Sequence, residues 1–267
     1  MPTTSVQMYS LRHSADVDLE RTVARAREIG YENIEPYGFV ENVETYERAL
    51  SASGVRAPSG HAPVIDSADP SAAFDAAKRL GMQIVIDPFV PEHRWRTADD
   101  AKRLADRVNE LAVLAHAHEL TFGYHNHQWE FANTVDGRPV FELFVDGLAP
   151  EVVLEVDTFW VTVGGADAPA LLRAHEDRVV AIHVKDGRVA PDILAGLSSE
   201  DPRHAAETLE FVFQHQTPAG QGDLDVKAIL AAAPRALRVV EFDTYRGDVF
   251  EGIAQSLSWL GRNDLDG

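Results

Sequence analysis

The chain has 267 residues and a formal net charge of −19, from 43 acidic and 24 basic residues. An acidic field of this size repels phosphate backbones and anionic lipids, which counts against nucleic acids and membranes as partners. The chain has no cysteine, which excludes disulfides, zinc–thiolate sites and Fe–S clusters.

Short apolar, β-rich segments alternate with helical patterns along the whole chain. The predicted strands lie at residues 5–10, 33–37, 55–61, 83–89, 120–127, 152–157, 179–186 and 237–243. The helical patterns between them lie at residues 18–30, 41–53, 70–80, 97–120, 139–148, 167–177, 225–233 and 247–260. Gly30 is the expected residue just beyond the first helix, and Thr97 is the expected N-cap of the longest one.

Regular alternation of strand and helix predicts a parallel sheet, and eight such units favour closure into an α/β fold, the (β/α)8 TIM barrel. A doubly wound open sheet is the alternative, but no glycine-rich nucleotide fingerprint follows the first strand. No linker interrupts the pattern, so we expect residues 1–267 to form a single barrel domain. The polar segment 187–223 is predicted to be an extended loop with one short helix near residues 205–215.

Polar residues end nearly every predicted strand, at the edge where barrels of this kind carry their active sites. They are Gln7, Glu35, His61, Asp87, His125 with His127, Asp157, His183 with Lys185, and Glu241 with Asp243. Residues two apart on a strand share a face, so His125 and His127 are expected to point together into one mouth.

Carboxylates and imidazoles without thiolates suit a divalent metal ion in a mixed nitrogen and oxygen sphere. Asp157, His183 and Glu241 come from consecutive strands, so the three side chains are expected to meet on one ion. The fifth strand supplies a fourth ligand, either His125 or Glu130, and we favour Glu130 for its charged oxygen. We expect manganese, with magnesium, cobalt, iron and zinc as alternatives, and we expect Lys185 to balance the surplus negative charge.

These residues lie in motifs that resemble the xylose isomerase-like TIM barrel superfamily, in particular its sugar phosphate isomerase/epimerase and inosose dehydratase-like group. The motifs are "VQMYSLR", "YHNHQWEF", "LEVDTFWV", "HVKDG", "AGQGDLD" and "VVEFD", which span essentially the whole chain. The resemblance implies a divalent metal held by Asp157, His183, Glu241 and an acidic residue of the fifth strand. The chain departs from the family's epimerases at His125, where they have a glutamate.

The combined pattern predicts a metal-dependent sugar or keto-sugar isomerase or epimerase that moves a proton next to a carbonyl through an enediolate. Glu130, His125 or His127 would act as the base, and Lys185 would hold a substrate oxygen or shuttle a proton. The expected substrate is an unphosphorylated small carbohydrate. Its contacts are expected from Gln7, Glu35, His61, Trp129, Trp160 and Arg246.

Other functions use the same residues differently. Loss of a β-hydroxyl or of a glycoside would make the protein a dehydratase or lyase acting on an inosose or a 3-keto-glycoside. A non-catalytic sugar-binding subunit is the alternative of another class, whereas a metal nuclease would need a basic groove. No run approaches 18 apolar residues and the first residues lack a signal-peptide pattern, so we expect a cytoplasmic location. The sequence leaves the oligomeric state open, a homo-oligomer included.

Overall fold

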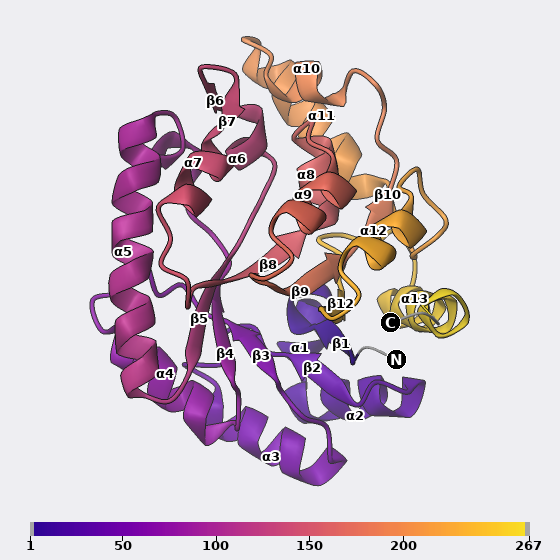
Figure 1. Cartoon of the computed structure of the whole chain (residues 1–267). Helices are drawn as coiled ribbons and strands as arrows, with labels where there is room; N and C mark the ends of the chain where they lie inside the picture. The colour runs from indigo at the N-terminus through magenta and orange to yellow at the C-terminus, as the bar shows by residue number, and fades with distance from the viewer. Residues whose placement is uncertain (1–2, 265–267) are drawn as a thin grey trace.

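The computed structural model describes residues 3–264, which form a parallel eight-stranded barrel surrounded by helices (Figure 1). Neighbouring strands pair in the order β2-β1-β12-β9-β8-β5-β4-β3. The two ends of this sheet meet through the parallel bridges Asn33–Arg56 and Tyr37–His61, which bring the barrel close to closure. The barrel strands are β1 (Thr4–Gln7), β2 (Asn33–Glu35), β3 (Ser59–His61), β4 (Ile84–Asp87), β5 (Thr121–His125), β8 (Val153–Asp157), β9 (Val179–Val184) and β12 (Leu237–Val240).

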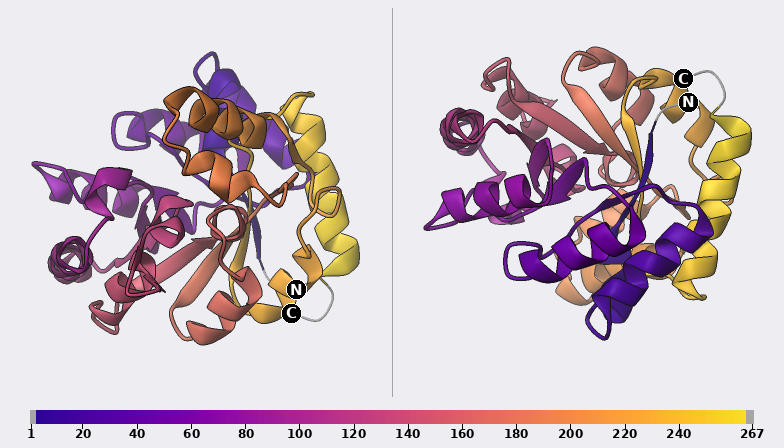
Figure 2. Two further views of the ribbon diagram at one scale, coloured as in Figure 1. Left: turned by 90° about the horizontal axis from the view of Figure 1, so that it is seen from above. Right: turned by 90° about the horizontal axis from the view of Figure 1, so that it is seen from below.

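An outer ring of helices follows the strands, as both end views of Figure 2 show. These helices are α2 (Leu19–Ile29), α3 (Val43–Ser53), α4 (Pro70–Arg79), α5 (Ala98–Ala117), α7 (Val140–Asp146), α9 (Ala168–Ala174), α12 (Val226–Ala232) and α13 (Val249–Asn263). Further helices lie in the connections: η1 (Met8–Leu11), α1 (Arg12–Ala15), η2 (Glu92–Arg94), α6 (Trp129–Ala132), α8 (Thr158–Val163), α10 (Ile193–Leu197) and the longer α11 (Pro202–Gln214). Two small antiparallel pairs complete the fold, β6 (Thr134–Val135) with β7 (Arg138–Pro139) and β10 (Asp186–Gly187) with β11 (Gln216–Thr217).

Helix α5 illustrates how the sequence pattern produces the outer ring. Thr97 caps it as expected: its hydroxyl accepts from the Asp100 amide at 3.1 Å, and the Asp100 carboxylate accepts from the Thr97 amide at 2.9 Å. Leu104, Val108 and Leu111 recur at steps of three and four residues and are buried against the barrel. This stripe is therefore the face that packs on the sheet.

Several strands are shorter than the pattern predicted, and proline explains three of these boundaries. Strand β2 ends before Pro36 and β4 ends before Pro88, while β3 begins after Pro58 instead of at residue 55. Proline has no backbone N–H to donate to a neighbouring strand, so it stops the ladder at these points.

The segment after β9 contains more structure than the one short helix that was predicted. Residues 187–223 include both α10 and α11, and their ends are tied by the pairing of β10 with β11. Helix α11 begins at Pro202 after the N-cap Asp201, whose carboxylate accepts from the Arg203 amide at 3.0 Å. An Asp-Pro pair is a common helix start, so the sequence did carry this signal.

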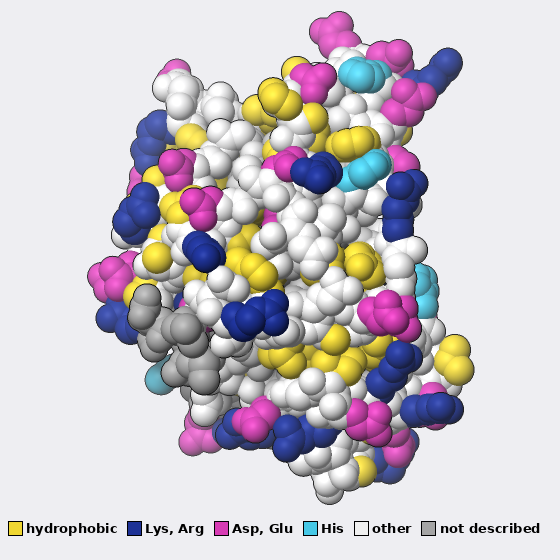
Figure 3. Space-filling view, turned by 90° about the vertical axis from the view of Figure 1, so that its right-hand side faces the viewer, with side chains coloured by type: hydrophobic (Ala, Val, Ile, Leu, Met, Phe, Trp, Pro, Cys, Tyr) yellow, Lys and Arg dark blue, Asp and Glu magenta, His cyan; other side chains and the backbone are white. Residues whose placement is uncertain are grey.

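The surface shows mixed charge. On the face drawn in Figure 3, Lys and Arg side chains are interspersed with Asp and Glu. This face therefore offers no continuous basic area to which a polyanion such as DNA could bind. Within residues 3–264, no helix combines the length and the apolar character that crossing a bilayer requires.

Gly123 in β5 is expected to resist substitution because the barrel wall is closed around it. A Cβ at this position would lie 2.7 Å from both the Ile86 Cδ1 and the Val153 carbonyl oxygen. We expect Gly123→Ala to lower the free energy of unfolding by about 1–3 kcal/mol, measured by urea titration. Gly261→Ala is the matched control, since a Cβ there meets nothing within 4 Å and the helix gains up to about 1 kcal/mol. If the two substitutions changed the free energy of unfolding by the same amount, β5 would have room for a side chain at this position.

Candidate active site

The carboxyl ends of the barrel strands surround a cavity of about 430 Å³. His61 and His125 end their strands there, and Glu241 follows directly after β12. Helix α11 covers one side through Leu209 and Phe213. The full lining is Tyr9, Arg12, Tyr37, His61, Pro88, Phe89, His125, His127, Gln128, Trp129, Trp160, Leu209, Phe213, Glu241, Asp243 and Thr244. The expected convergence of strand ends on one mouth is therefore present.

Three of the predicted metal ligands, Asp157, His183 and Glu241, lie together and are called the mouth group below. One ligand atom from each lies within 4.8 Å of the others. The Nδ1 atom of His183 is 2.6 Å from Glu241 Oε2 and 3.9 Å from Asp157 Oδ2. All three side chains are buried, so they form a preformed set of one nitrogen and several oxygen donors that could hold a metal.

Lys185 neutralises part of this negative charge. Its Nζ lies 2.8 Å from Asp157 Oδ2, 2.7 Å from Glu241 Oε2 and 2.8 Å from Asp243 Oδ2. Burial lowers the pKa of Lys185, but these carboxylates outweigh it and hold the pKa well above the usual value. Lys185 is therefore a permanent cation.

The two candidates for the fourth ligand are placed differently. The Nε2 atom of His125 lies 3.8 Å from Asp157 Oδ2, at the edge of the mouth group. Glu130 is buried behind the cavity wall, where its carboxyl group accepts from the Tyr124 hydroxyl at 2.8 Å and from the His127 amide at 3.0 Å. Of the two side chains, only His125 therefore places a potential ligand atom, its Nε2, on the side of Asp157.

Beneath the mouth group lies a second set of buried side chains, called the inner group: Glu35, His61 and Glu155. Glu155 precedes Asp157 by two residues on β8, so it shares its face and lies one step deeper in the barrel. His61 Nε2 is 2.5 Å from Glu155 Oε2 and 3.2 Å from Glu35 Oε1. Gln7 donates to Glu35 at 2.7 Å, and Ser59 also donates to this carboxylate.

Burial sets the protonation of His125 and His127, two of the histidines that face the cavity. It lowers the pKa of His125 to about 3, helped by the charge of His183, and it lowers the pKa of His127 well below the usual range. His127 stacks on Trp129 with ring centroids 4.6 Å apart, and its buried Nδ1 has no hydrogen-bond partner. Both histidines are neutral imidazoles near neutral pH, which can accept a proton or bind a cation.

Glu130 gives a pH-dependent contribution to stability. Burial raises its pKa to about 8 from the ordinary 4.5. Between these values the folded protein holds a proton that the unfolded chain releases, so this contribution falls as the pH rises from about 5 to 8. In Glu130→Gln this contribution is absent. We therefore expect the free energy of unfolding of wild type, measured by urea titration, to fall by up to a few kcal/mol relative to that of the variant as the pH rises from about 5 to 8. Parallel stability curves for the two proteins would contradict the raised pKa.

The predicted substrate contacts fall into two sets. His61, Trp129 and Trp160 line the cavity. Gln7 and Glu35 are fully buried below it and contact each other. Arg246 is exposed and donates to Gln214 at 3.1 Å, away from the lining.

Sequence reasoning missed other residues of the cavity. Tyr9 and Tyr37 line the cavity as an edge-to-face pair with centroids 5.0 Å apart, and Phe89 also lines it. Arg12 also lines the cavity, but its guanidinium donates to the carbonyls of Tyr9 and Asp243 at 2.7 and 2.8 Å. Tyr9 and Arg12 lie in the motif "VQMYSLR", which was available as a signal.

A family model described as the xylose isomerase-like TIM barrel matches residues 23–260. The chain belongs to this family. The match covers the strands from β2 to β12 and therefore includes the mouth group and the inner group.

Other proteins resemble this chain in sequence or in fold. An inosose dehydratase from Salmonella agona is 26% identical over 182 residues, which cover 67% of this chain and 58% of that protein. The chain thus spans less than two thirds of this curated relative. A sugar phosphate isomerase/epimerase from Parabacteroides distasonis superposes with a TM-score of 0.75 at 20% identity, covering 97% of this chain and 93% of the other. A xylose isomerase-like TIM barrel protein from Mycobacterium smegmatis in complex with magnesium gives a TM-score of 0.66 at 15% identity, covering 98% and 96% of the two chains.

Proposed function

We propose that the protein is a divalent-cation-dependent enzyme that moves a proton next to the carbonyl of a keto-sugar or cyclitol. The observation that carries this proposal is the mouth group, three buried ligands within 4.8 Å of one another, of which Glu241 lines the cavity. Asp157 Oδ2 is buried there, and the Lys185 ammonium group, 2.8 Å away, already pairs it with a positive charge. Asp157, His183 and Glu241 would hold the ion, with His125 as the fourth ligand instead of Glu130.

Charge supports this ligand set. Asp157, Glu241 and Asp243 contribute three negative charges, and Lys185 contributes one positive charge among them. A divalent cation supplies the two charges that remain, so His125 suits the set better than a fourth carboxylate. Two imidazoles and two carboxylates suit manganese, iron, cobalt or zinc, and we would test manganese first. When bound, such an ion polarises a carbonyl and a neighbouring hydroxyl and offsets the charge of an enediolate.

His127 is the proposed base. Its ring lines the cavity between Phe89 and Trp129, where a neutral imidazole offers a lone pair to a bound substrate. It would take the proton from the carbon next to the carbonyl and return it to the same or the neighbouring carbon. Glu130 would support it from behind, since the Glu130 carboxyl accepts from the His127 amide.

The rest of the cavity fits an unphosphorylated sugar. Arg12 is the only Lys or Arg among the lining residues, and its guanidinium is already bonded to two backbone carbonyls. Trp129 and Trp160 offer flat apolar surfaces on which a sugar ring can stack. Lys185 lies outside the lining, and its ammonium group already contacts three carboxylates, so it would act by balancing charge.

Dehydration of an inosose is the second candidate, favoured by the similarity to inosose dehydratase. Both reactions begin with removal of the same proton, so one experiment tests them together. The manganese-loaded protein would be incubated in D₂O with keto-sugars, inososes and their phosphates. Deuterium at one carbon with an isomeric product supports the first reaction, and loss of water to an unsaturated ketone supports the second. Saturable binding without any exchange would replace both with a sugar-binding role, and preference for a phosphate would contradict the proposed substrate class.

A further inference from the structure

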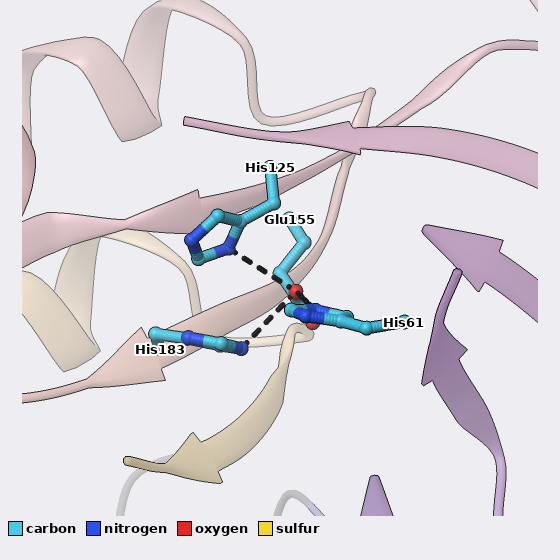
Figure 4. Close-up of side chains that lie close together, drawn as sticks. All are labelled: His61, His125, Glu155 and His183. Atoms are coloured by element: carbon cyan, nitrogen blue, oxygen red, sulfur yellow. Dashed lines mark hydrogen bonds and ion pairs between the residues drawn. The ribbon is translucent and has the colours of Figure 1, made fainter. Parts of the chain in front are cut away.

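We propose that Glu155 is a positioning residue that fixes which ring nitrogens of His125 and His183 face the cation. This inference rests on the proposed function of the mouth group. Figure 4 shows the Glu155 carboxylate surrounded by three imidazoles from three different strands. Its Oε2 atom lies 2.5 Å from His61 Nε2, 3.1 Å from His183 Nε2 and 3.3 Å from His125 Nδ1.

Each of the two proposed histidine ligands divides its nitrogens between the two groups. His183 turns Nδ1 toward Glu241 at 2.6 Å and Nε2 toward Glu155. His125 turns Nε2 toward Asp157 at 3.8 Å and Nδ1 toward Glu155. An imidazole that binds a cation through one ring nitrogen keeps its single N–H on the other. A carboxylate on the inner side holds the proton there and leaves the lone pair on the side of the mouth group.

The same geometry argues against a second cation in the inner side chains. His61, His125, Glu155 and His183 also bring one ligand atom each within 4.8 Å of the others. Filling this set and the mouth group together would require both nitrogens of His125 and of His183 to act as ligands. Both side chains would then have to be imidazolates, with no proton on either ring nitrogen. We therefore expect the chain to bind one cation, in the mouth group.

Unpartnered atoms point to the same contact. Glu155 Oε1 and His125 Nδ1 are both buried without an aligned hydrogen-bond partner. The same His125 Nδ1 atom lies 3.3 Å from the other carboxylate oxygen, Glu155 Oε2. A cation that draws the His125 Nε2 atom toward Asp157 would align the opposite N–H with Glu155. His61 holds the Glu155 carboxylate from the far side, and Glu35 Oε1, 3.0 Å from His183 Nε2, offers that nitrogen a second carboxylate on the inner side.

The test compares Glu155→Gln with wild type. Glutamine keeps the shape but loses the negative charge, so its oxygen accepts more weakly from the two ligand histidines than the carboxylate does. We expect the affinity for Co²⁺, measured by calorimetry and visible absorption, to fall about 10- to 100-fold. In the zinc-loaded wild type, ¹⁵N imidazole spectra should show the ring protons on His125 Nδ1 and His183 Nε2, and the variant should lose this pattern.

Asp87→Asn is the matched control. Asp87 is also a buried carboxyl group at a strand end, but it accepts only from the backbone amides of Val64, Ile65 and Phe89. Its loss should lower stability and leave Co²⁺ affinity unchanged. Unchanged affinity in Glu155→Gln, or two Co²⁺ ions per wild-type chain, would overturn the role of Glu155 while leaving a cation-dependent enzyme. A wild-type chain that binds no Co²⁺ and no Mn²⁺ would overturn the proposed function and this inference with it.

Discussion

Asp157→Asn should abolish cation-dependent activity while the fold survives. Asp157 has two separable tasks in the structure. Its Oδ1 atom caps α8 by accepting from the Trp160 amide at 3.0 Å, and its Oδ2 atom faces Lys185 and the mouth group. Asparagine keeps an oxygen for the cap but loses the charge, so we expect Mn²⁺ affinity to fall by more than about 100-fold, since even outer contacts to a metal site cost 10- to 100-fold. Calorimetry and proton exchange in D₂O would measure both effects.

Asp167→Asn provides the matched control for this change. Asp167 caps α9 in the same way, accepting from the Ala170 amide at 2.8 Å, but it is exposed and makes no contact with the mouth group. We expect Asp167→Asn to keep full cation affinity and exchange activity. If Asp157→Asn still bound Mn²⁺ as tightly as this control, the mouth group would not be the cation site.

The strands and the outer helices could be predicted because their signals are local. Apolar runs and three-to-four residue spacing fixed which segments form the barrel, and strand parity correctly placed Asp157, His183 and Glu241 at one mouth. The two-residue period of a strand also places Glu155 on the same face as Asp157. Its contact with three histidines depends on the relative register of β3, β5, β8 and β9, which no single segment encodes.

The same reasoning could not predict where the Glu130 side chain lies. It follows β5 in a motif rich in polar residues, and nothing local says where the chain turns after the strand. In the structure α6 begins at Trp129 and directs Glu130 toward the Tyr124 hydroxyl, behind the cavity wall. The direction of a side chain beyond a strand end depends on the loop, whereas the direction of a side chain within the strand follows from its period.

Lys185→Met should destabilise the cation-free protein more than any change at the surface. Lys185 is buried among Asp157, Glu241 and Asp243, and methionine fills similar space without the charge. Breaking a buried charge pair by removing one partner costs about 3–5 kcal/mol, because the remaining charges stay buried without compensation. We expect a loss of this size in urea unfolding of the cation-free variant. Lys78→Met is the control, since its exposed pair with Glu119 should contribute less than about 1 kcal/mol.

The response of Lys185→Met to manganese then distinguishes charge balance from packing. The ammonium group and a divalent ion both lie against Asp157 Oδ2 and Glu241 Oε2 in the proposed site, so they repel each other there. Removing the ammonium group leaves these oxygens more negative. Saturating Mn²⁺ should therefore raise the unfolding midpoint of the variant by more than it raises that of wild type. An equal rise in the two proteins would mean that the lysine and the ion do not share these carboxylates, and that the stability lost in the variant comes from packing alone.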